Sequence, residues 1–152
     1  MECNITKRIR GGDAYYTINW SPLEEINKYR IMASVPSMSG IFELYYLDDS
    51  KTLNIFCLSR AWYGGIRNTV REMCDPVSIR YPEYRSFFSE HPVILRYALS
   101  DSFQDMADVL YFFFSSGVLQ SRESEASGRY GDIYVKEQSR DKLVTIRTSE
   151  AS

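Results

Sequence analysis

Apolar runs alternate with short polar breaks along most of the chain, and each run predicts a strand or a helix. Aromatic and β-branched residues dominate at residues 14–20, 41–47, 52–58 and 93–99, which predicts strands there. The middle two runs are apolar at almost every position. They are separated only by Asp48-Asp49-Ser50-Lys51, so they predict a β-hairpin that is buried on both faces.

Helices are predicted from start and stop signals combined with apolar spacing. Ser21-Pro22-Leu23-Glu24 has the form of a capping box and predicts a helix running to about Arg30. Gly64-Gly65 precedes a second helix, whose apolar positions recur until Asp75-Pro76. A short helix is predicted at residues 81–89, and the most apolar helix of the chain at residues 102–117.

The C-terminal part has a different composition from the rest. Residues 120–131 contain almost no apolar side chain and predict a mobile connection, and residues 132–147 predict a terminal hairpin. We therefore predict one domain over residues 1–152 with its core at residues 14–117. The expected fold class is α+β, with a small, mainly antiparallel central sheet flanked by helices. The side chains predicted to be buried are Phe42, Leu44, Phe56, Leu58, Leu110 and Phe113.

Composition and charge narrow the possible partners. The chain is 44% hydrophobic and 14% aromatic, which is enough for one core, and its net charge of −2 gives no general attraction to nucleic acid or anionic membranes. Six arginines between residues 60 and 96 make that segment weakly basic. No run approaches the length of a membrane span, and the first ten residues lack the apolar run of a signal peptide, so we expect a cytoplasmic protein without membrane association.

Several kinds of site are disfavoured by the residues present. Cys3, Cys57 and Cys74 show no paired spacing, which argues against a disulfide framework or a zinc knuckle. His91 is the single histidine, so a site with several histidine ligands cannot form, and a loop role is expected for it. No phosphate-binding loop, dinucleotide fingerprint or nucleophile elbow is found. We expect no cofactor and no tightly bound metal.

Between residues 29 and 117 the order of elements resembles the GIY-YIG nuclease superfamily. That family has a first strand beginning Gly-Ile-Tyr, a second carrying Tyr-Ile-Gly, a helix with an essential arginine and a later helix with a metal-binding glutamate. Gly40-Ile41-Phe42 matches the first motif with phenylalanine in place of tyrosine. The second motif has two possible registers, Phe56-Cys57-Leu58 at near-normal spacing or Tyr63-Gly64-Gly65 after a longer insertion.

The resemblance also places the remaining catalytic groups. The family arginine falls near Arg67, Thr69 or Arg71, and Asp105 and Asp108 are the only acids on the helix expected to carry the glutamate. Candidate catalytic residues are therefore Tyr63, Arg67, Arg71 and Asp108. Because the tyrosines and the glutamate are replaced or displaced, the resemblance implies a degenerate, non-catalytic member.

The function expected from these features is binding. Trp62 and Tyr63 on a loop, next to Arg67 and Arg71 on a helix, are the candidate binding residues. A protein partner is favoured over nucleic acid because the chain is slightly acidic. The alternatives are a nucleic-acid-binding protein that uses the same residues, or a weakly active metal-dependent endonuclease of the GIY-YIG type.

Overall fold

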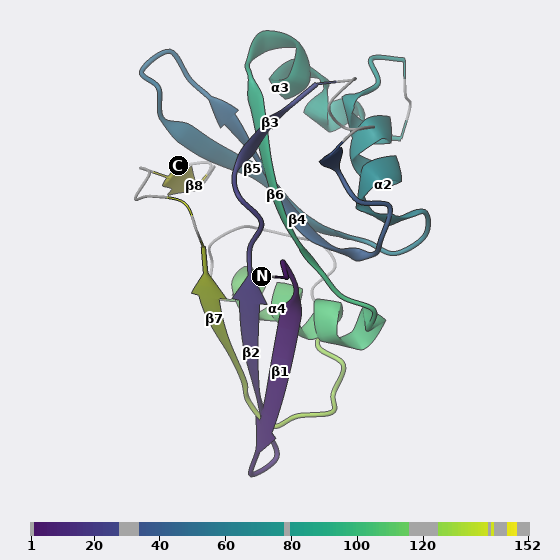
Figure 1. Ribbon diagram of the computed structural model, residues 1–152, viewed down its shortest axis with the longest axis vertical. Coiled ribbons are helices and arrows are strands. Elements are labelled where there is room, and N and C mark those ends of the chain that lie inside the picture. Colours follow the sequence, from purple (N-terminus) through teal and green to yellow (C-terminus); the bar gives the residue numbers. More distant parts are fainter. Residues whose placement is uncertain are drawn as a thin grey trace.

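Two β-sheets and the helices packed against them form the protein (Figure 1). The computed structural model describes residues 2–27, 34–77, 80–115, 125–139 and 141, and the backbone of 146–148. The larger sheet has the order β3–β6–β4–β5–β8, formed by Glu24–Ile26, Val93–Leu99, Gly40–Leu47, Leu53–Ala61 and Ile146–Thr148. The smaller sheet has the order β1–β2–β7, formed by Ile5–Arg10, Asp13–Asn19 and Ile133–Gln138. The helices described are α2 (Gly65–Cys74), α3 (Arg85–Glu90) and α4 (Phe103–Ser115), with a 3-10 turn, η1, at Pro82–Tyr84.

Most strand pairs are antiparallel, and the pairs β2–β7 and β5–β8 are parallel. The predicted α+β class is therefore confirmed, as is the antiparallel hairpin of β4 and β5. Its turn is held by the Asp48 carboxylate, which accepts hydrogen bonds from the backbone N–H groups of Ser50 and Thr52. None of the helices in the described residues is long and apolar enough to cross a membrane.

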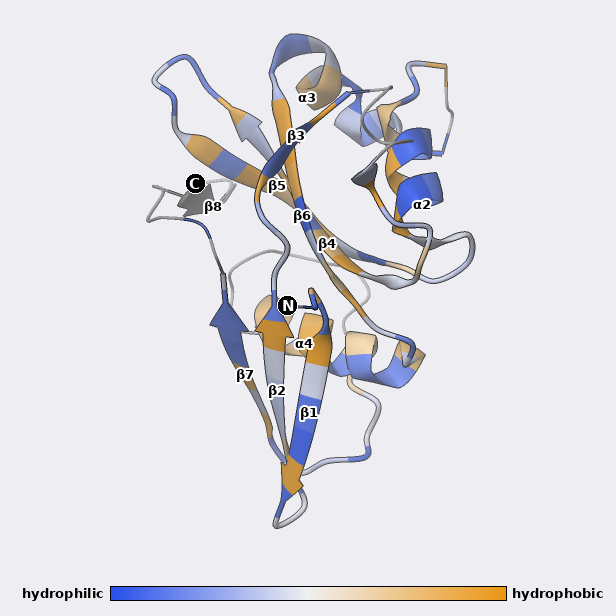
Figure 2. Cartoon of the chain, in the orientation of Figure 1, coloured by the Kyte–Doolittle hydropathy of each residue, from blue (hydrophilic) through white to orange (hydrophobic). Residues whose placement is uncertain are grey.

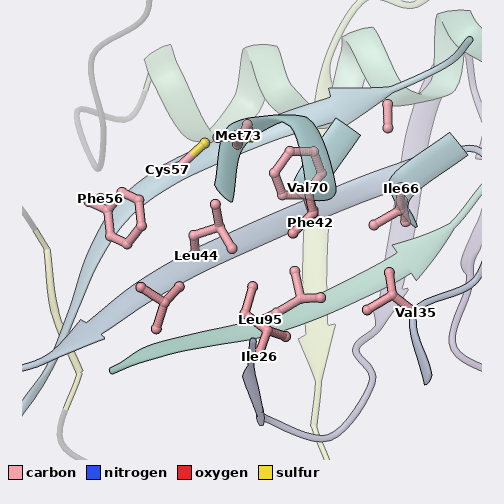
Figure 3. Packing of buried hydrophobic residues seen from close by; sticks show 12 residues of the cluster. Ile26, Val35, Phe42, Leu44, Phe56, Cys57, Ile66, Val70, Met73 and Leu95 are labelled. Atoms are coloured by element: carbon pink, nitrogen blue, oxygen red, sulfur yellow. The ribbon is translucent and has the colours of Figure 1, made fainter. Parts of the chain in front are cut away.

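The core lies on both faces of the β5–β4–β6 part of the larger sheet. Phe42 of β4 packs with Ile66 and Val70 of α2, and Figure 3 shows this cluster gathered at the sheet. Ile41, its neighbour in the chain, packs instead with Met106 of α4. Adjacent residues of a strand point to opposite faces, so α2 and α4 cover opposite faces of this sheet. All six side chains predicted to be buried are buried, namely Phe42, Leu44, Phe56, Leu58, Leu110 and Phe113.

The predicted helix after Ser21 is wrong over the residues that the structure describes. Residues 24–26 form the strand β3, which pairs with β6, and residues 28–30 lie outside the described part of the chain. The side chain of Ser21 accepts a hydrogen bond from the backbone N–H of Tyr97, and the backbone N–H of Ser21 donates to the carbonyl of Tyr97. The hydroxyl expected to cap a helix is therefore used to attach this segment to β6.

The predicted terminal hairpin is also wrong. β7 pairs in parallel with β2 in the smaller sheet, and β8 pairs in parallel with β5 in the larger one. The smaller sheet itself was not predicted, because β1 lies outside the expected core and one central sheet was expected. Gly11 and Gly12 have positive φ angles of 60° and 86° and form the turn between β1 and β2.

Residues 120–131 were expected to be a mobile connection, and residues 120–124 lie outside the described part of the chain. The rest of this segment is attached to the protein, because Ser127 and Arg129 bond to Asp108 of α4. The low apolar content of the segment therefore does not mean that it lacks contacts, because these contacts are made through polar groups.

Candidate functional site

The structure does not bring the candidate catalytic residues together. Arg67 and Arg71 lie on α2, whereas Asp108 lies on α4, and these helices cover opposite faces of the larger sheet. Tyr63 lies in the loop between β5 and α2, where it is 88% exposed. An arginine and a carboxylate that are separated by a sheet cannot act on the same phosphate.

The two arginines of α2 have different surroundings. Arg67 is partly buried, and its Nε donates a hydrogen bond to the carbonyl of Val35 at 2.6 Å. Its backbone N–H donates to the carbonyl of Pro36, so Arg67 fastens the segment that precedes β4. Arg71 is exposed and donates to the Oδ1 atom of Asn68 at 2.9 Å.

The residues matched to the family tyrosines in the first register belong to the core. Phe42 is fully buried, and Phe56 stacks on Phe87 of α3 with ring centroids 4.3 Å apart. Burial also raises the pKa of the Cys57 thiol to about 12, so this side chain is not a nucleophile at neutral pH. His91 ends α3, and its ring packs against Tyr46 at 4.8 Å.

Asp108 lies at the centre of a polar cluster between α4 and the smaller sheet. It is completely buried and accepts hydrogen bonds from the Tyr16 hydroxyl at 2.8 Å, from the Ser127 backbone N–H at 2.7 Å, from the Ser127 hydroxyl at 2.9 Å and from Arg129 at 3.0 Å. Burial and the hydrogen bond to Asp108 raise the pKa of Tyr16 far above its usual value. Every partner of this carboxylate comes from outside α4.

Asp105, one turn earlier on α4, extends the same cluster. Its Oδ1 atom accepts from Lys7 at 3.0 Å, from Arg129 at 2.9 Å and from Tyr16 at 3.2 Å. Burial acts to raise the pKa of Asp105, but the bonds from Arg129 and Lys7 outweigh it and hold this pKa below its usual value. Lys7 also donates to the Tyr130 hydroxyl at 2.8 Å.

The polar cluster is balanced in charge and does not form a metal centre. Its two carboxylates, Asp105 and Asp108, face the two cations Lys7 and Arg129. Across the described chain, no group of three or more His, Cys, Asp or Glu side chains is arranged to hold a metal ion. Two acids at i and i+3 on the most apolar helix were the sequence signal for this cluster, whereas Tyr16, Ser127 and Arg129 gave none.

A second polar cluster joins the two sheets around Arg96 of β6. Its Nε donates to Glu43 of β4 at 2.5 Å, and its guanidinium reaches Glu137 of β7 at 3.5 Å. The same guanidinium lies over the ring of Trp20 at 4.4 Å, and the Trp20 indole N–H donates to Glu137 at 2.8 Å. These contacts are structural because most of the participating groups are buried or half-buried.

Three exposed aromatic residues, Trp62, Tyr63 and Phe103, lie near one end of the larger sheet. Gly40 pairs with both Ala61 and Leu99, so the start of β4 and the ends of β5 and β6 coincide. Met38 precedes β4, Trp62 and Tyr63 follow β5, and Phe103 follows β6. These side chains are exposed, Met38 by 59%, Trp62 by 36%, Tyr63 by 88% and Phe103 by 42%. We call Met38, Arg60, Trp62, Tyr63 and Phe103 the Trp62 surface.

Phe103 contacts two other members of the Trp62 surface. The Trp62 and Phe103 rings meet edge to face with centroids 5.5 Å apart, and the Arg60 guanidinium lies over the Phe103 ring at 4.2 Å. The loop that carries Tyr63 is fixed at Gly65, which has a φ of 76°, and a Cβ atom at this position would overlap the backbone of Ser37. The sequence had indicated Trp62 and Tyr63 but not Met38 or Phe103.

Comparison with known proteins adds a family but no activity. No curated protein and no solved structure matches the chain. The model of a protein family described as "Uncharacterised protein" matches residues 4–152. Because this match covers nearly the whole sequence, the chain belongs to that family.

Proposed function

We propose that the protein is a non-catalytic binding domain that recognises another protein through the Trp62 surface. The observation that carries this proposal is the group of four exposed apolar side chains at one end of a sheet, with Trp62 and Phe103 in contact and Arg60 over the Phe103 ring. Trp, Tyr, Met and Arg are the residues enriched in the energetic centres of protein interfaces. Exposed apolar groups that lie together, rather than singly, mark interaction sites.

The arrangement of elements supports a degenerate GIY-YIG-like scaffold as part of this proposal. A hairpin (β4–β5), a helix (α2) and a later helix (α4) follow one another in the order that the resemblance implies, with η1, α3 and β6 between the two helices. The groups that would carry out hydrolysis do not meet, since Arg67 bonds to backbone and Asp108 is enclosed by its own partners. The scaffold is therefore proposed to be retained without the reaction.

Charge favours a protein partner for this surface. Arg60 is the only basic member of the Trp62 surface, and it is already engaged with the Phe103 ring. A nucleic-acid site needs several cations facing successive phosphates. The partner proposed is a protein segment with one or two large apolar side chains, which pack against Trp62 and Tyr63, and a carboxylate that reaches Arg60.

Site-specific photo-crosslinking tests this proposal in the cells that make the protein. A photoreactive amino acid at Tyr63 is expected to capture one defined protein, whereas the same group at Tyr111, an exposed position of α4, is not. Trp62→Ala is then expected to weaken binding of the purified partner by at least tenfold, since interface tryptophans contribute about 2 kcal/mol or more. Tyr111→Ala provides the matched control and should leave the affinity unchanged.

Two results would contradict the proposal. Capture of the same proteins from positions 63 and 111 would show that the crosslinking is nonspecific. An unchanged affinity in Trp62→Ala would show that the Trp62 surface does not contribute to binding. Capture of a second copy of this chain would assign the surface to self-association.

A further inference from the structure

The smaller sheet has a second exposed face with an ordered row of side chains. On β2, Ala14, Tyr16 and Ile18 are buried in the cluster that contains α4, so Tyr15 and Thr17 between them point to the other face. Figure 1 shows α4 on one side of these three strands. The face that bears Tyr15 is therefore the outer face of the sheet. Figure 2 shows hydrophilic residues in the middle of β1.

The strand register aligns three side chains across this outer face. Arg8 of β1 lies opposite Tyr15 of β2, and Tyr15 lies opposite Tyr134 of β7. The two tyrosine rings are stacked, with centroids 4.8 Å apart and planes inclined by 14°, and the Arg8 guanidinium lies over Tyr15 at 5.9 Å. The result is a cation–ring–ring stack that runs across the strands.

This stack is open at one end. β7 occupies the edge position in the strand order β1–β2–β7, so one face of the Tyr134 ring is turned away from its stacking partner Tyr15. Tyr134 is 46% exposed. A further planar ring can therefore stack on Tyr134 and continue the row without displacing any contact described above.

The charge around the stack suits an anionic ligand. A groove of about 430 Å³ follows this face, and its lining includes Lys7, Arg8 and Lys136 but no acidic residue. The chain as a whole has 20 acidic and 18 basic residues, so the positive charge of this groove is a local feature. Lys7 is bonded to Asp105 on the inner side, which leaves Arg8 and Lys136 to face a ligand.

The acids nearest to the stack lie at the tip of the sheet. Asp13 accepts a hydrogen bond from the backbone N–H of Asp132, and the charge of Asp132 raises the pKa of the Tyr134 hydroxyl. Lys136 pairs with Thr17 and so lies two residues from Tyr134 in the opposite direction. An extended anion would therefore pass from Tyr134 towards Lys136 and away from the tip.

We propose that this outer face binds single-stranded nucleic acid, with a base stacked on Tyr134 and phosphates in contact with Arg8 and Lys136. Planar bases match the open tyrosine ring, and the phosphates match the two cations. Stacking of this kind tolerates any base, so recognition without a defined sequence is expected. The proposal concerns a different surface from the Trp62 surface and does not depend on its function.

Fluorescence anisotropy with a labelled oligothymidylate of about 12 nucleotides tests the proposal. Binding is expected at low salt. Tyr134→Ala should weaken it by about fivefold or more, whereas Tyr134→Phe should bind like the wild type because the ring is kept. The double variant Arg8→Ala, Lys136→Ala should lower the slope of log affinity against log salt by about 1.4, as expected for two lost phosphate contacts with a single strand.

Controls separate stacking from general attraction to polyanions. Lys51→Asn removes a charge from the distant β4–β5 turn, where the positive φ of 65° suits asparagine, and should change nothing. Absence of binding at low salt, equal affinity in wild type and Tyr134→Ala, or binding of heparin as tight as that of the oligonucleotide would each overturn the proposal. Thermal unfolding of each variant confirms that it is folded before binding is measured.

Discussion

Removal of the Asp108 carboxylate is the sharpest test of the polar cluster. Asp108→Ala deletes the acceptor of four hydrogen bonds and leaves Arg129, Tyr16 and Ser127 beside a buried void. Breaking a buried ion pair by removing one partner costs about 3–5 kcal/mol, because the other charge is left without compensation. Here Asp105 still pairs with Arg129, which limits the loss, so we expect about 3 kcal/mol.

Urea unfolding measures this loss. With a slope of about 2 kcal/mol per molar urea, a loss of about 3 kcal/mol lowers the midpoint by roughly 1.5 M. Such a loss is a large part of the ~5–15 kcal/mol that stabilises a typical domain. Asp101→Ala removes an exposed acid just before α4 and should change stability by less than about 0.5 kcal/mol.

Two further measurements show whether the loss arises from the contacts described. A double-mutant cycle between Asp108→Ala and Ser127→Ala should give a coupling energy of roughly 0.5–3 kcal/mol, as found for residues in one hydrogen-bonded network. Hydrogen exchange at the Ser127 amide, which donates to Asp108, should become faster in Asp108→Ala. A destabilisation below about 1 kcal/mol together with additive single effects would refute the reasoning.

Three other predictions concern the remaining contacts. Gly65→Ala should lower the free energy of unfolding more than Gly11→Ala, because both glycines have positive φ but only at Gly65 would a Cβ atom overlap backbone. Urea unfolding of both variants measures this difference, and equal losses of stability would contradict it. Arg96→Met should lower the free energy of unfolding by about 3–5 kcal/mol in the same assay, and adding Glu43→Leu should recover most of this loss. No recovery in the double variant would show that the ion pair stabilises the fold by more than the desolvation of its two charges costs. Folding lowers the pKa of Asp105 below its usual value of 3.8. The ionised carboxylate should therefore stabilise the fold above pH 3.8, and this stabilisation should be lost as the pH falls through the pKa of the folded state. A stability difference between wild type and Asp105→Asn that persists to pH 2 would contradict this.

The central strands of the larger sheet, β5, β4 and β6, could be predicted because apolar residues dominate them. β4 and β5 are buried along most of their length, so their runs of apolar residues needed no assumption about which face is exposed. β1 shows the opposite case. Its outer positions are polar, and Lys7 on its inner side meets Asp105 instead of an apolar residue, so no alternation marks the strand.

The candidate site was harder to predict, because its geometry depends on contacts between distant parts of the chain. The sequence indicated Trp62 and Tyr63, but Phe103 reaches them only through the register that aligns the ends of β5 and β6. The partners of Asp108 lie up to 92 positions away in the chain. The stacked pair of Tyr15 and Tyr134 depends on a parallel pairing of β2 and β7, whereas local patterns favoured a hairpin instead.

Helix α4 connects the two surfaces for which binding is proposed. Its first residue, Phe103, belongs to the Trp62 surface, and two residues later Asp105 binds Lys7 on β1, next to Arg8 of the tyrosine stack. Ion pairs and hydrogen bonds have directional requirements that apolar contacts lack, so Asp105 and Asp108 determine how the smaller sheet is placed on the helix. Asp105 and Asp108 therefore have a structural role in this chain, because they hold Lys7 and Arg129 against α4. They bind side chains of β1 and β2, and so position the sheet for whose outer face we propose nucleic-acid binding.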